Sequence, residues 1–481
     1  MQAQRLAGLE PAAVFGYFEK LCSLPHGSGN TKIISDWLVS FAQEQGLRYI
    51  QDELNNVILF APGTPGYEDH EPVILQGHMD MVCEKDADCP INFETDGLDV
   101  THDGNVVFAR GTTLGGDDGI AVAYALAILA DKNIPHPPLE VVITVDEETG
   151  MYGAAGIDLS MLEGKKLINI DSEEEGIFTV SCAGGARAGI TMEARRHAVY
   201  GPCIRLSVDG LAGGHSGVEI DKNRANANKI MGEFLSEVKA RMPLCLTAIE
   251  GGSKDNAIPR TCTASMVAMS MDLEQINDIA AALQEKVRRE YAEPDAVISA
   301  DNIDALGGNA LSTGDTDRII GLLCSVPNAI QAMCADMPGL VQTSLNLGIV
   351  RLENEGFRMT FSVRSSVNQE KMDLLKKLED IANLYGCAFT SAGHYPAWEY
   401  KEDSALREIM VAEYEKMFDG KPQVVSIHAG LECGLLGEKI PGLDAVSIGP
   451  QMHDIHTSRE RLEIASTARM WEFLKAVLKA M

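Results

Sequence analysis

Three short apolar stretches of this chain run directly into histidine or acidic residues, and this pattern limits the fold more than any other feature. They are residues 72–76 (PVILQ), 139–145 (LEVVITV) and 166–170 (KLINI). Short apolar runs bounded by turn or polar residues are typical of buried strands. A helical pattern over 118–130, opened by Gly115 and Gly116 and ending before Pro135, separates the first two. Strands that alternate with helices predict an α/β fold.

Histidine or carboxylate residues come directly after each of the three stretches. In open α/β sheets, ligand sites lie beyond the carboxyl ends of the strands. We therefore expect one sheet edge to gather side chains that are far apart in sequence, namely His78, Asp80, Glu147, Glu148 and Asp171.

Five motifs carry candidate chemistry, and each one alone has an ordinary structural explanation. They are His78-Met79-Asp80, the GGDDG run at 115–119, Asp146-Glu147-Glu148, Asp171, and His456 after the VSIGP run. A His-x-Asp pair is often structural, an aspartate often caps a helix, and consecutive carboxylates often end a strand in solvent. Together, however, they combine two histidines with several carboxylates and no cysteine. That set suits zinc, or another first-row divalent ion, in a catalytic site.

The pattern changes twice along the 481 residues, which exceed the length of one typical domain. From about residue 186, alternating strand patterns (CIRLSVDG, FRMTFSVRSS) and an amphipathic helix over 272–291 predominate. After residue 392 the earlier pattern of short apolar strands and helices returns, with strands expected at 424–427 and 445–448 and a helix at 465–481. We expect one domain made of 1–185 and 393–481, interrupted by an inserted α+β domain at 186–392.

Composition and charge exclude several classes of protein. The formal net charge is −30, which repels phosphate backbones, so we expect no nucleic-acid partner. The sequence contains neither an apolar run long enough to span a membrane nor a secretory signal pattern near its start, so we expect no membrane association. Eleven irregularly spaced cysteines without a Cys-x-x-Cys pair indicate reduced thiols and a cytoplasmic location.

In this order, the five motifs resemble those of the di-zinc aminoacylase, carboxypeptidase and dipeptidase superfamily of metallopeptidases. The VDEETGMYGA and HAGLECG stretches are most similar to the aminoacyl-histidine dipeptidase branch. The resemblance covers the whole chain. It implies a zinc-peptidase-like catalytic domain, with a mixed central sheet flanked by helices, and an inserted lid and dimerisation domain. It also implies two Zn²⁺ per chain, with Mn²⁺ or Co²⁺ as substitutes, and a homodimer formed through the lid.

The resemblance assigns the metal ligands residue by residue. Asp117 would bridge the two ions, His78 and Asp171 would complete one site, and Glu148 and His456 the other. Asp118 and His453 are the alternatives. We choose Asp117 because relatives often have asparagine at the second position. We choose His456 because the Thr-Ser-Arg-Glu run after it resembles the family pattern.

The remaining roles also come from the resemblance. Asp80 would orient His78, and Glu147 would be the general base for a water that bridges the metals. In the inserted domain, His215 of a GGHSG loop would stabilise the oxyanion. Asn256 and Arg364 match positions that hold the substrate carboxylate in relatives. Taken alone, these three residues would be a loop histidine, a surface amide and a surface arginine.

Glu432 is a candidate partner for the free α-amino group of a substrate, with a helix-capping or solvated glutamate as the alternative. The predicted function is hydrolysis of unblocked dipeptides, including carnosine-like Xaa-His substrates. A tripeptidase or an N-acyl amino acid deacylase is the alternative enzyme. A metal-binding or peptide-binding protein without activity is the remote alternative, and the presence of both Glu147 and Asp80 argues against it.

Overall fold

The chain divides into two compact units. The computed structural model describes residues 5–268, 272–335, 337, 339–353 and 356–481, so small parts of both expected domains lie outside the described residues. The first unit runs to Ser181 and also contains Tyr400–Ser426 and Leu431–Met481, and the second contains Cys182–Glu399 and Ile427–Gly430. These joints differ by several residues from those expected at 185/186 and 392/393. The return of residues 427–430 to the second unit was not expected from the sequence.

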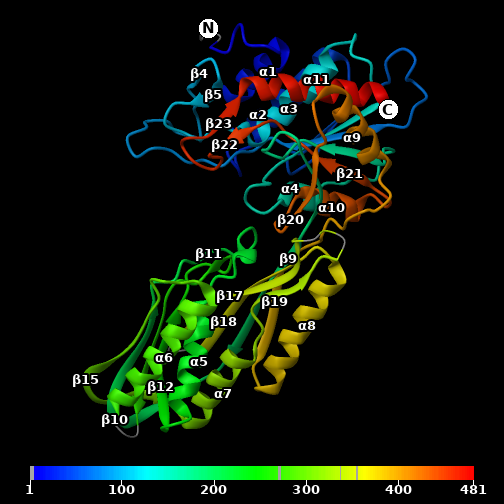
Figure 1. Cartoon of the computed structure of the whole chain (residues 1–481). Helices are drawn as coiled ribbons and strands as arrows, with labels where there is room; N and C mark the ends of the chain where they lie inside the picture. The colour runs from blue at the N-terminus through cyan, green and yellow to red at the C-terminus, as the bar shows by residue number, and fades with distance from the viewer. Residues whose placement is uncertain (1–4, 269–271, 336, 338, 354–355) are drawn as a thin grey trace. The chain divides into compact units, whose positions relative to one another are not determined.

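An eight-stranded mixed sheet forms the centre of the first unit (Figure 1). Its strands in spatial order are β1 (Arg48–Gln51), β2 (Val57–Ala61), β6 (Leu139–Thr144), β3 (Val73–His78), β7 (Lys166–Asn169), β21 (Asp444–Ser447), β8 (Ile177–Cys182) and β20 (Gln423–Ile427). The three predicted strands are β3, β6 and β7. They are neighbours in parallel register, and β6 and β3 are buried along their whole length, as strands covered on both faces are.

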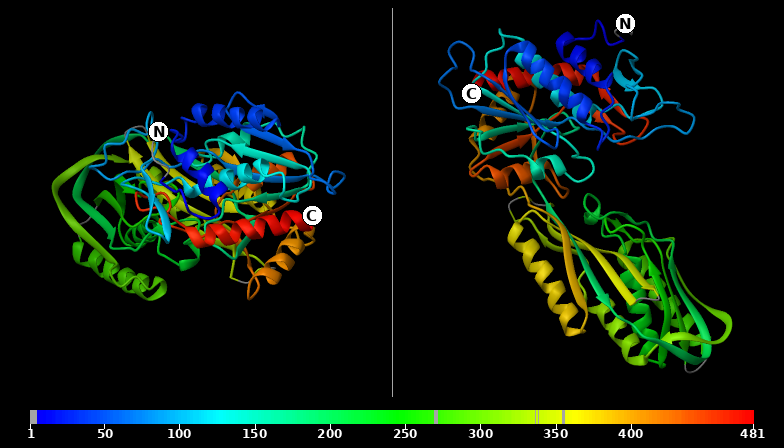
Figure 2. Two further views of the ribbon diagram at one scale, coloured as in Figure 1. Left: turned by 90° about the horizontal axis from the view of Figure 1, so that it is seen from above. Right: turned by 180° about the vertical axis from the view of Figure 1, so that it is seen from behind.

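The first unit also contains helices from both ends of the chain. They are α1 (Ala12–Cys22), α2 (Lys32–Gln45), α3 (Gly116–Ala130), α4 (Tyr152–Gly156), α9 (Ala405–Met417), α10 (Glu432–Lys439) and α11 (Ile464–Ala480). Helix α3 is buried on nearly all sides, which explains its almost uniformly apolar sequence. Tyr124 of α3 stacks on Trp471 of α11 with ring centroids 6.1 Å apart. Both views in Figure 2 show the first helices and the last helix in the same unit. The mixed sheet with flanking helices confirms the predicted fold class of this domain.

A small four-stranded sheet in the first unit was not expected from the sequence. Its order is β22 (Met452–His453), β23 (Arg461–Glu463), β5 (Val106–Ala109) and β4 (Val100–His102). These strands have two to four residues each, too few to show a periodic pattern. The connection between β22 and β23 carries His456.

The second unit is a nine-stranded sheet with helices packed on it. The strand order is β15 (Val297–Leu311), β10 (Arg196–Asp209), β14 (Cys262–Ala268), β12 (Leu244–Gly251), β17 (Val341–Glu353), β18 (Gly356–Ser365), β9 (Gly184–Met192) and β19 (Ala388–Tyr395), with β16 (Ala329–Met333) paired to β17. The helices are α5 (Ala227–Lys239), α6 (Leu273–Tyr291), α7 (Thr313–Ser325) and α8 (Asn368–Leu384), with a 3₁₀ turn at Ile220–Lys222. All four helices contribute to one buried core with this sheet, as the alternating strand patterns predict.

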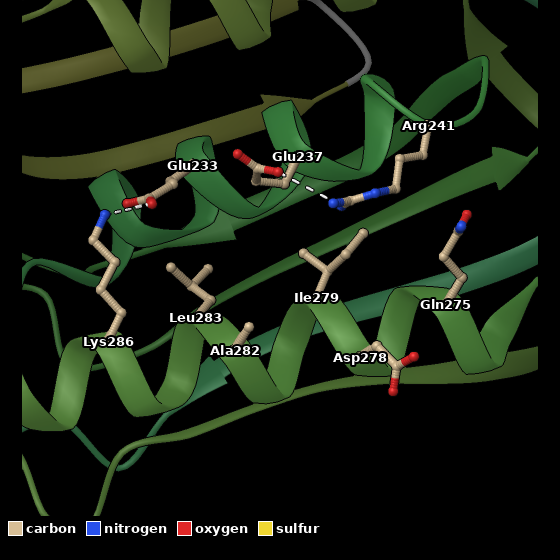
Figure 3. A pocket seen from close by; sticks show the side chains of 9 residues that line it. All are labelled: Glu233, Glu237, Arg241, Gln275, Asp278, Ile279, Ala282, Leu283 and Lys286. Atoms are coloured by element: carbon tan, nitrogen blue, oxygen red, sulfur yellow. Dashed lines mark hydrogen bonds and ion pairs between the residues drawn. The ribbon is translucent and has the colours of Figure 1, made fainter.

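A groove of about 420 Å³ lies between α5 and α6 (Figure 3). Four of its five charged residues are paired with one another: Lys286 with Glu233 at 2.6 Å, and Arg241 with Glu237 at 3.6 Å, while Asp278 is the fifth. Ile279 and Leu283, which also line it, belong to the buried core of the unit.

Candidate metal centre

The carboxyl ends of β3, β6 and β7 bring the predicted acidic and histidine residues together. His78 is the last residue of β3, and its Nε2 lies 3.5 Å from Oδ1 of Asp171, which follows β7. Beyond β6, the Glu147 N–H donates to Oδ1 of Asp80 at 3.2 Å. The expectation that these residues meet at one edge of the sheet is confirmed, since parallel neighbouring strands end on the same side.

Asp117 lies between the two histidines at the start of α3. Its Oδ1 is 3.2 Å from Nε2 of His78, and its Oδ2 is 3.1 Å from Nε2 of His456. Gly115 precedes it with φ +68°, in the left-handed region that favours glycine. This turn directs the Asp117 carboxylate toward both histidines, so its two oxygens face two different groups of side chains.

Two sets of three ligand residues share Asp117. In the first predicted set, Nε2 of His78 lies 3.2 Å from Asp117 and 3.5 Å from Asp171, and Asp118 also lies within ligand distance of His78 and Asp171. The second set is Asp117, Glu148 and His456, and Nε2 of His456 is 3.0 Å from Oε1 of Glu148. A zinc ion bound tetrahedrally at 2.0–2.1 Å separates its ligand atoms by about 3.3 Å. The separations between the histidine nitrogens and the carboxylate oxygens, from 3.0 to 3.5 Å, match that geometry. The residues present therefore fit two divalent ions.

The electrostatics of the cluster also favour cations. Hydrogen bonds with Asp117 and Glu148 raise the pKa of His456 to about 11. Burial raises the pKa of Asp171 to about 7. Protons bound to His456 and Asp171 occupy the lone pairs that a metal ion requires. Divalent ions would supply the positive charge that these protons otherwise provide.

The two alternative ligands take other partners. His453 Nε2 lies 2.8 Å from Oε1 of Glu463. Asp118 is fully buried, and its Oδ2 accepts a hydrogen bond from the His78 backbone N–H at 3.2 Å. Asp118 does lie close enough to His78 and Asp171 to share an ion with them. Asp117, however, is the aspartate whose carboxylate contacts both histidines, His78 through Oδ1 and His456 through Oδ2.

The tautomer of His78 is fixed chiefly by a carbonyl group rather than by the expected carboxylate. Nδ1 of His78 donates to the backbone oxygen of Asp80 at 2.9 Å, and the Asp80 carboxylate is farther away, at 3.4 Å. Either partner leaves the Nε2 lone pair available for a metal ion. The carboxylate is in turn held by the Ser28 hydroxyl at 2.8 Å. Nothing in the sequence pattern indicated Ser28, which precedes Asp80 by 52 residues.

Glu147 is partly buried beside Glu148, one of the predicted ligands. Burial raises the pKa of the Glu147 carboxyl well above its ordinary value, and the Asp171 and Glu432 charges add to this effect. A carboxylate with a raised pKa is a more effective proton acceptor near neutral pH. Glu147 also lies close enough to His78 and Glu148 to contact an ion shared with them.

The surroundings of Glu432 rule out the alternative of a solvated side chain. It is the first residue of α10 and is fully buried, and its Oε2 accepts hydrogen bonds from Gln76 and Thr144, both at 2.6 Å. Burial raises its pKa to about 7. Its other oxygen, Oε1, has no hydrogen-bond partner among the described residues. A buried acceptor without a partner is costly, so this oxygen is suited to a ligand that brings its own donor.

Three further candidates, His215, Asn256 and Arg364, lie in the second unit. His215 belongs to the short strand β11 (Gly214–His215), which pairs with β13 (Ala257–Ile258), so His215 lies beside the exposed residue Asn256. Nδ1 of His215 accepts hydrogen bonds from the N–H groups of Gly217 and Val218, each at 3.2 Å. The neutral ring therefore carries its proton on Nε2, where it is available to donate.

Arg364 lies on β18 and donates to the Tyr395 hydroxyl at 3.2 Å. Burial and the Arg364 charge together lower the pKa of His215, which keeps the imidazole neutral. They also lower the pKa of His428, to about 4. His428 shares a 2.7 Å hydrogen bond with Ser344 and was not predicted as a site residue. Its only signal in the sequence was its place at the start of the HAGLECG stretch.

Comparisons with known proteins agree with this geometry. Residues 74–480 match the model of peptidase family M20/M25/M40. The chain is 35% identical over 478 residues to the cytosol non-specific dipeptidase of Escherichia coli (strain K12), covering 98% of each protein. Its structure is similar to that of aminoacylhistidine dipeptidase from Vibrio alginolyticus, with TM-score 0.94, 35% identity, and coverage of 99% of this chain and 98% of the other. The aminopeptidase PepT structure from Bacillus cereus shares the fold, with TM-score 0.57 and 16% identity over 98% of this chain and 99% of the other.

Proposed function

Because this chain belongs to peptidase family M20/M25/M40, we propose that it is a metallopeptidase that hydrolyses unblocked dipeptides, Xaa-His dipeptides among them. The observation that carries the proposal is the Asp117 carboxylate, which presents one oxygen to His78 and the other to His456. Two relatives similar along their whole length are named as dipeptidases, and this favours a dipeptidase over a tripeptidase or a deacylase.

We assign the metal sites to zinc, two ions per chain, with manganese or cobalt as substitutes. His78, Asp117 and Asp171 would hold one ion, and Asp117, Glu148 and His456 the other. The nitrogen and oxygen donors and their separations support this choice. When bound, two such ions polarise the scissile carbonyl and lower the pKa of a water molecule.

The protein side chains then divide the remaining work. Glu147 takes a proton from the attacking water and delivers it to the nitrogen of the leaving amine, as its raised pKa supports. Asp80 holds His78 in the tautomer that leaves Nε2 available. His215 donates from Nε2 to the oxyanion, and Asn256 and Arg364 receive the substrate carboxylate. The hydrogen bonds to Nδ1 of His215 support this donor role.

Glu432 would bind the substrate ammonium group through Oε1. We expect Glu432→Gln to raise KM for Xaa-His dipeptides about 10- to 100-fold, because a hydrogen bond to a charged group contributes about 1.5–3 kcal/mol. The amide oxygen still accepts from Gln76 and Thr144, so the fold is kept. The measurement compares KM for β-alanyl-histidine with inhibition by its N-acetyl derivative, which should not change. An unchanged KM would remove Glu432 from the substrate site.

We further propose a cytoplasmic homodimer that forms through the second unit. The name of the E. coli relative, a cytosol dipeptidase, supports the location. Among the described residues, no helix is both long and apolar enough to cross a membrane. The mass of the protein in solution, measured by sedimentation, tests the dimer. Mixed dimers of His215 and Glu147 variants would show whether His215 serves its own chain or the partner.

The decisive test of function is a substrate panel assayed with and without a chelator. The panel is β-alanyl-histidine, Leu-His, Gly-Gly-Gly and an N-acetyl amino acid. We expect cleavage of the two dipeptides alone, loss of activity with chelator, and recovery when zinc is added. Cleavage of only the acetylated substrate would identify a deacylase. No activity with two ions bound would favour the binding protein.

A further inference from the structure

The Glu460 carboxylate is buried against the backbone at the start of α3. Its Oε2 accepts hydrogen bonds from the N–H groups of Leu114 at 2.7 Å and Gly115 at 3.2 Å. Its Oε1 accepts from Gly116 at 2.7 Å and Asp117 at 3.4 Å. Four consecutive N–H groups thus converge on one side chain that is only 3% exposed. Successive N–H groups that turn toward one point form a concave site for an anion, and here the anion belongs to the chain itself.

The two glycines allow this close approach. Gly115 has φ +68°, and a Cβ atom on Gly116 would lie 3.1 Å from Oε1 of Glu460. The segment therefore wraps tightly around the carboxylate. The fourth N–H in this arrangement belongs to Asp117, whose carboxylate is shared by the two ligand sets. Glu460 consequently fixes the backbone from which Asp117 extends.

Glu460 also closes the turn that carries the second histidine. Its N–H donates to the Thr457 carbonyl at 3.1 Å, and His456 precedes that residue in the connection from β22 to β23. The His456 side chain is 48% exposed, and its backbone has φ +59°. Packing around the His456 side chain therefore does little to fix the position of its imidazole. The contact of Glu460 with residues 114–117 fastens the His456 turn to the Asp117 turn.

We propose that Glu460 is a positioning residue for the second metal site, where it fixes the distance between Asp117 and His456. The inference rests on the proposed function, since it assumes that these two residues bind one ion. Glu460 contacts the backbone of Asp117 and of the turn that carries His456, so it would act on a bound ion only through these two ligands. Residues that orient ligands in this way typically change metal affinity about 10- to 100-fold when they are replaced.

The test uses Glu460→Gln and Glu460→Asp in the full chain, with Glu140→Gln as the matched control. Glu140 is also a buried carboxylate that holds a loop, because it accepts the N–H groups of Glu163 and Gly164, both at 2.9 Å. It lies at the start of β6, whereas the metal cluster is at the end of that strand. Zinc affinity is measured by competition with a chelator, and amide exchange is measured on the metal-free protein.

We expect both Glu460 variants to bind the weaker zinc ion about 10- to 100-fold less tightly and to exchange the amides of 114–117 at least about tenfold faster. Glu460→Asp keeps the negative charge, but its side chain is one methylene shorter. An equal loss of zinc affinity in this variant would show that the position of the carboxylate matters and not only its charge. Glu140→Gln should leave zinc affinity unchanged. Wild-type affinity in Glu460→Asp, or equal losses in the control, would overturn the inference. Exchange at 114–117 remains informative even if the wild-type protein cleaves no dipeptide.

Discussion

Replacing Asp117 with asparagine lowers kcat/KM for dipeptides about 10⁴-fold and reduces the bound zinc to one ion per chain or fewer. Asp117 is the residue that faces both histidines, so its loss removes one ligand from each set. Metal ions contribute several kcal/mol of transition-state stabilisation, and each 1.36 kcal/mol corresponds to a factor of ten in rate. The measurement is steady-state kinetics together with metal content by elemental analysis.

Asp118→Asn is the matched control for this prediction. The two aspartates are adjacent and the substitution is isosteric, but Asp118 accepts a hydrogen bond from the His78 backbone N–H, which an asparagine oxygen also accepts. We expect this variant to keep two ions and to retain activity within about tenfold of the wild type. If instead Asp118→Asn lost both ions while Asp117→Asn kept them, Asp118 would be the bridging ligand.

Replacing Glu147 with glutamine lowers kcat about 10²- to 10⁴-fold with KM and zinc content unchanged. Glutamine keeps the size of the side chain but neither accepts the proton of the attacking water nor delivers it to the amine. The outcome also settles whether Glu147 is itself a ligand, since it lies close enough to His78 and Glu148 to contact an ion.

Glu148→Gln supplies the comparison for Glu147. Its Oε1 lies 3.0 Å from Nε2 of His456, so this variant should lose zinc as well as activity. The two neighbouring substitutions therefore separate proton transfer from metal binding. If Glu147→Gln lost an ion, or kept kcat within tenfold, the general-base assignment would fail.

Local patterns in the sequence were sufficient for the strands that build the candidate site. β3, β6 and β7 were predicted because short apolar runs bounded by polar residues have few alternatives in a protein of this size. Helix α6 follows the predicted range, since Asp272 caps it by accepting the Gln275 N–H at 2.9 Å. The strands of the small sheet on either side of His456 have too few residues to show an alternating apolar pattern, and they were not predicted.

By itself, the sequence determined the α/β class and the residues that the ends of the strands bring together, because the apolar pattern of a strand and the chemistry of its side chains are local properties. Only the tertiary structure decided how these residues are held. The Asp80 carbonyl is the closer partner of His78, Ser28 holds the Asp80 carboxylate, and Glu432 is buried. Glu460 lies 343 residues from Asp117 yet accepts its N–H. Such contacts depend on distances between segments far apart in the chain, and no local pattern of residues records them.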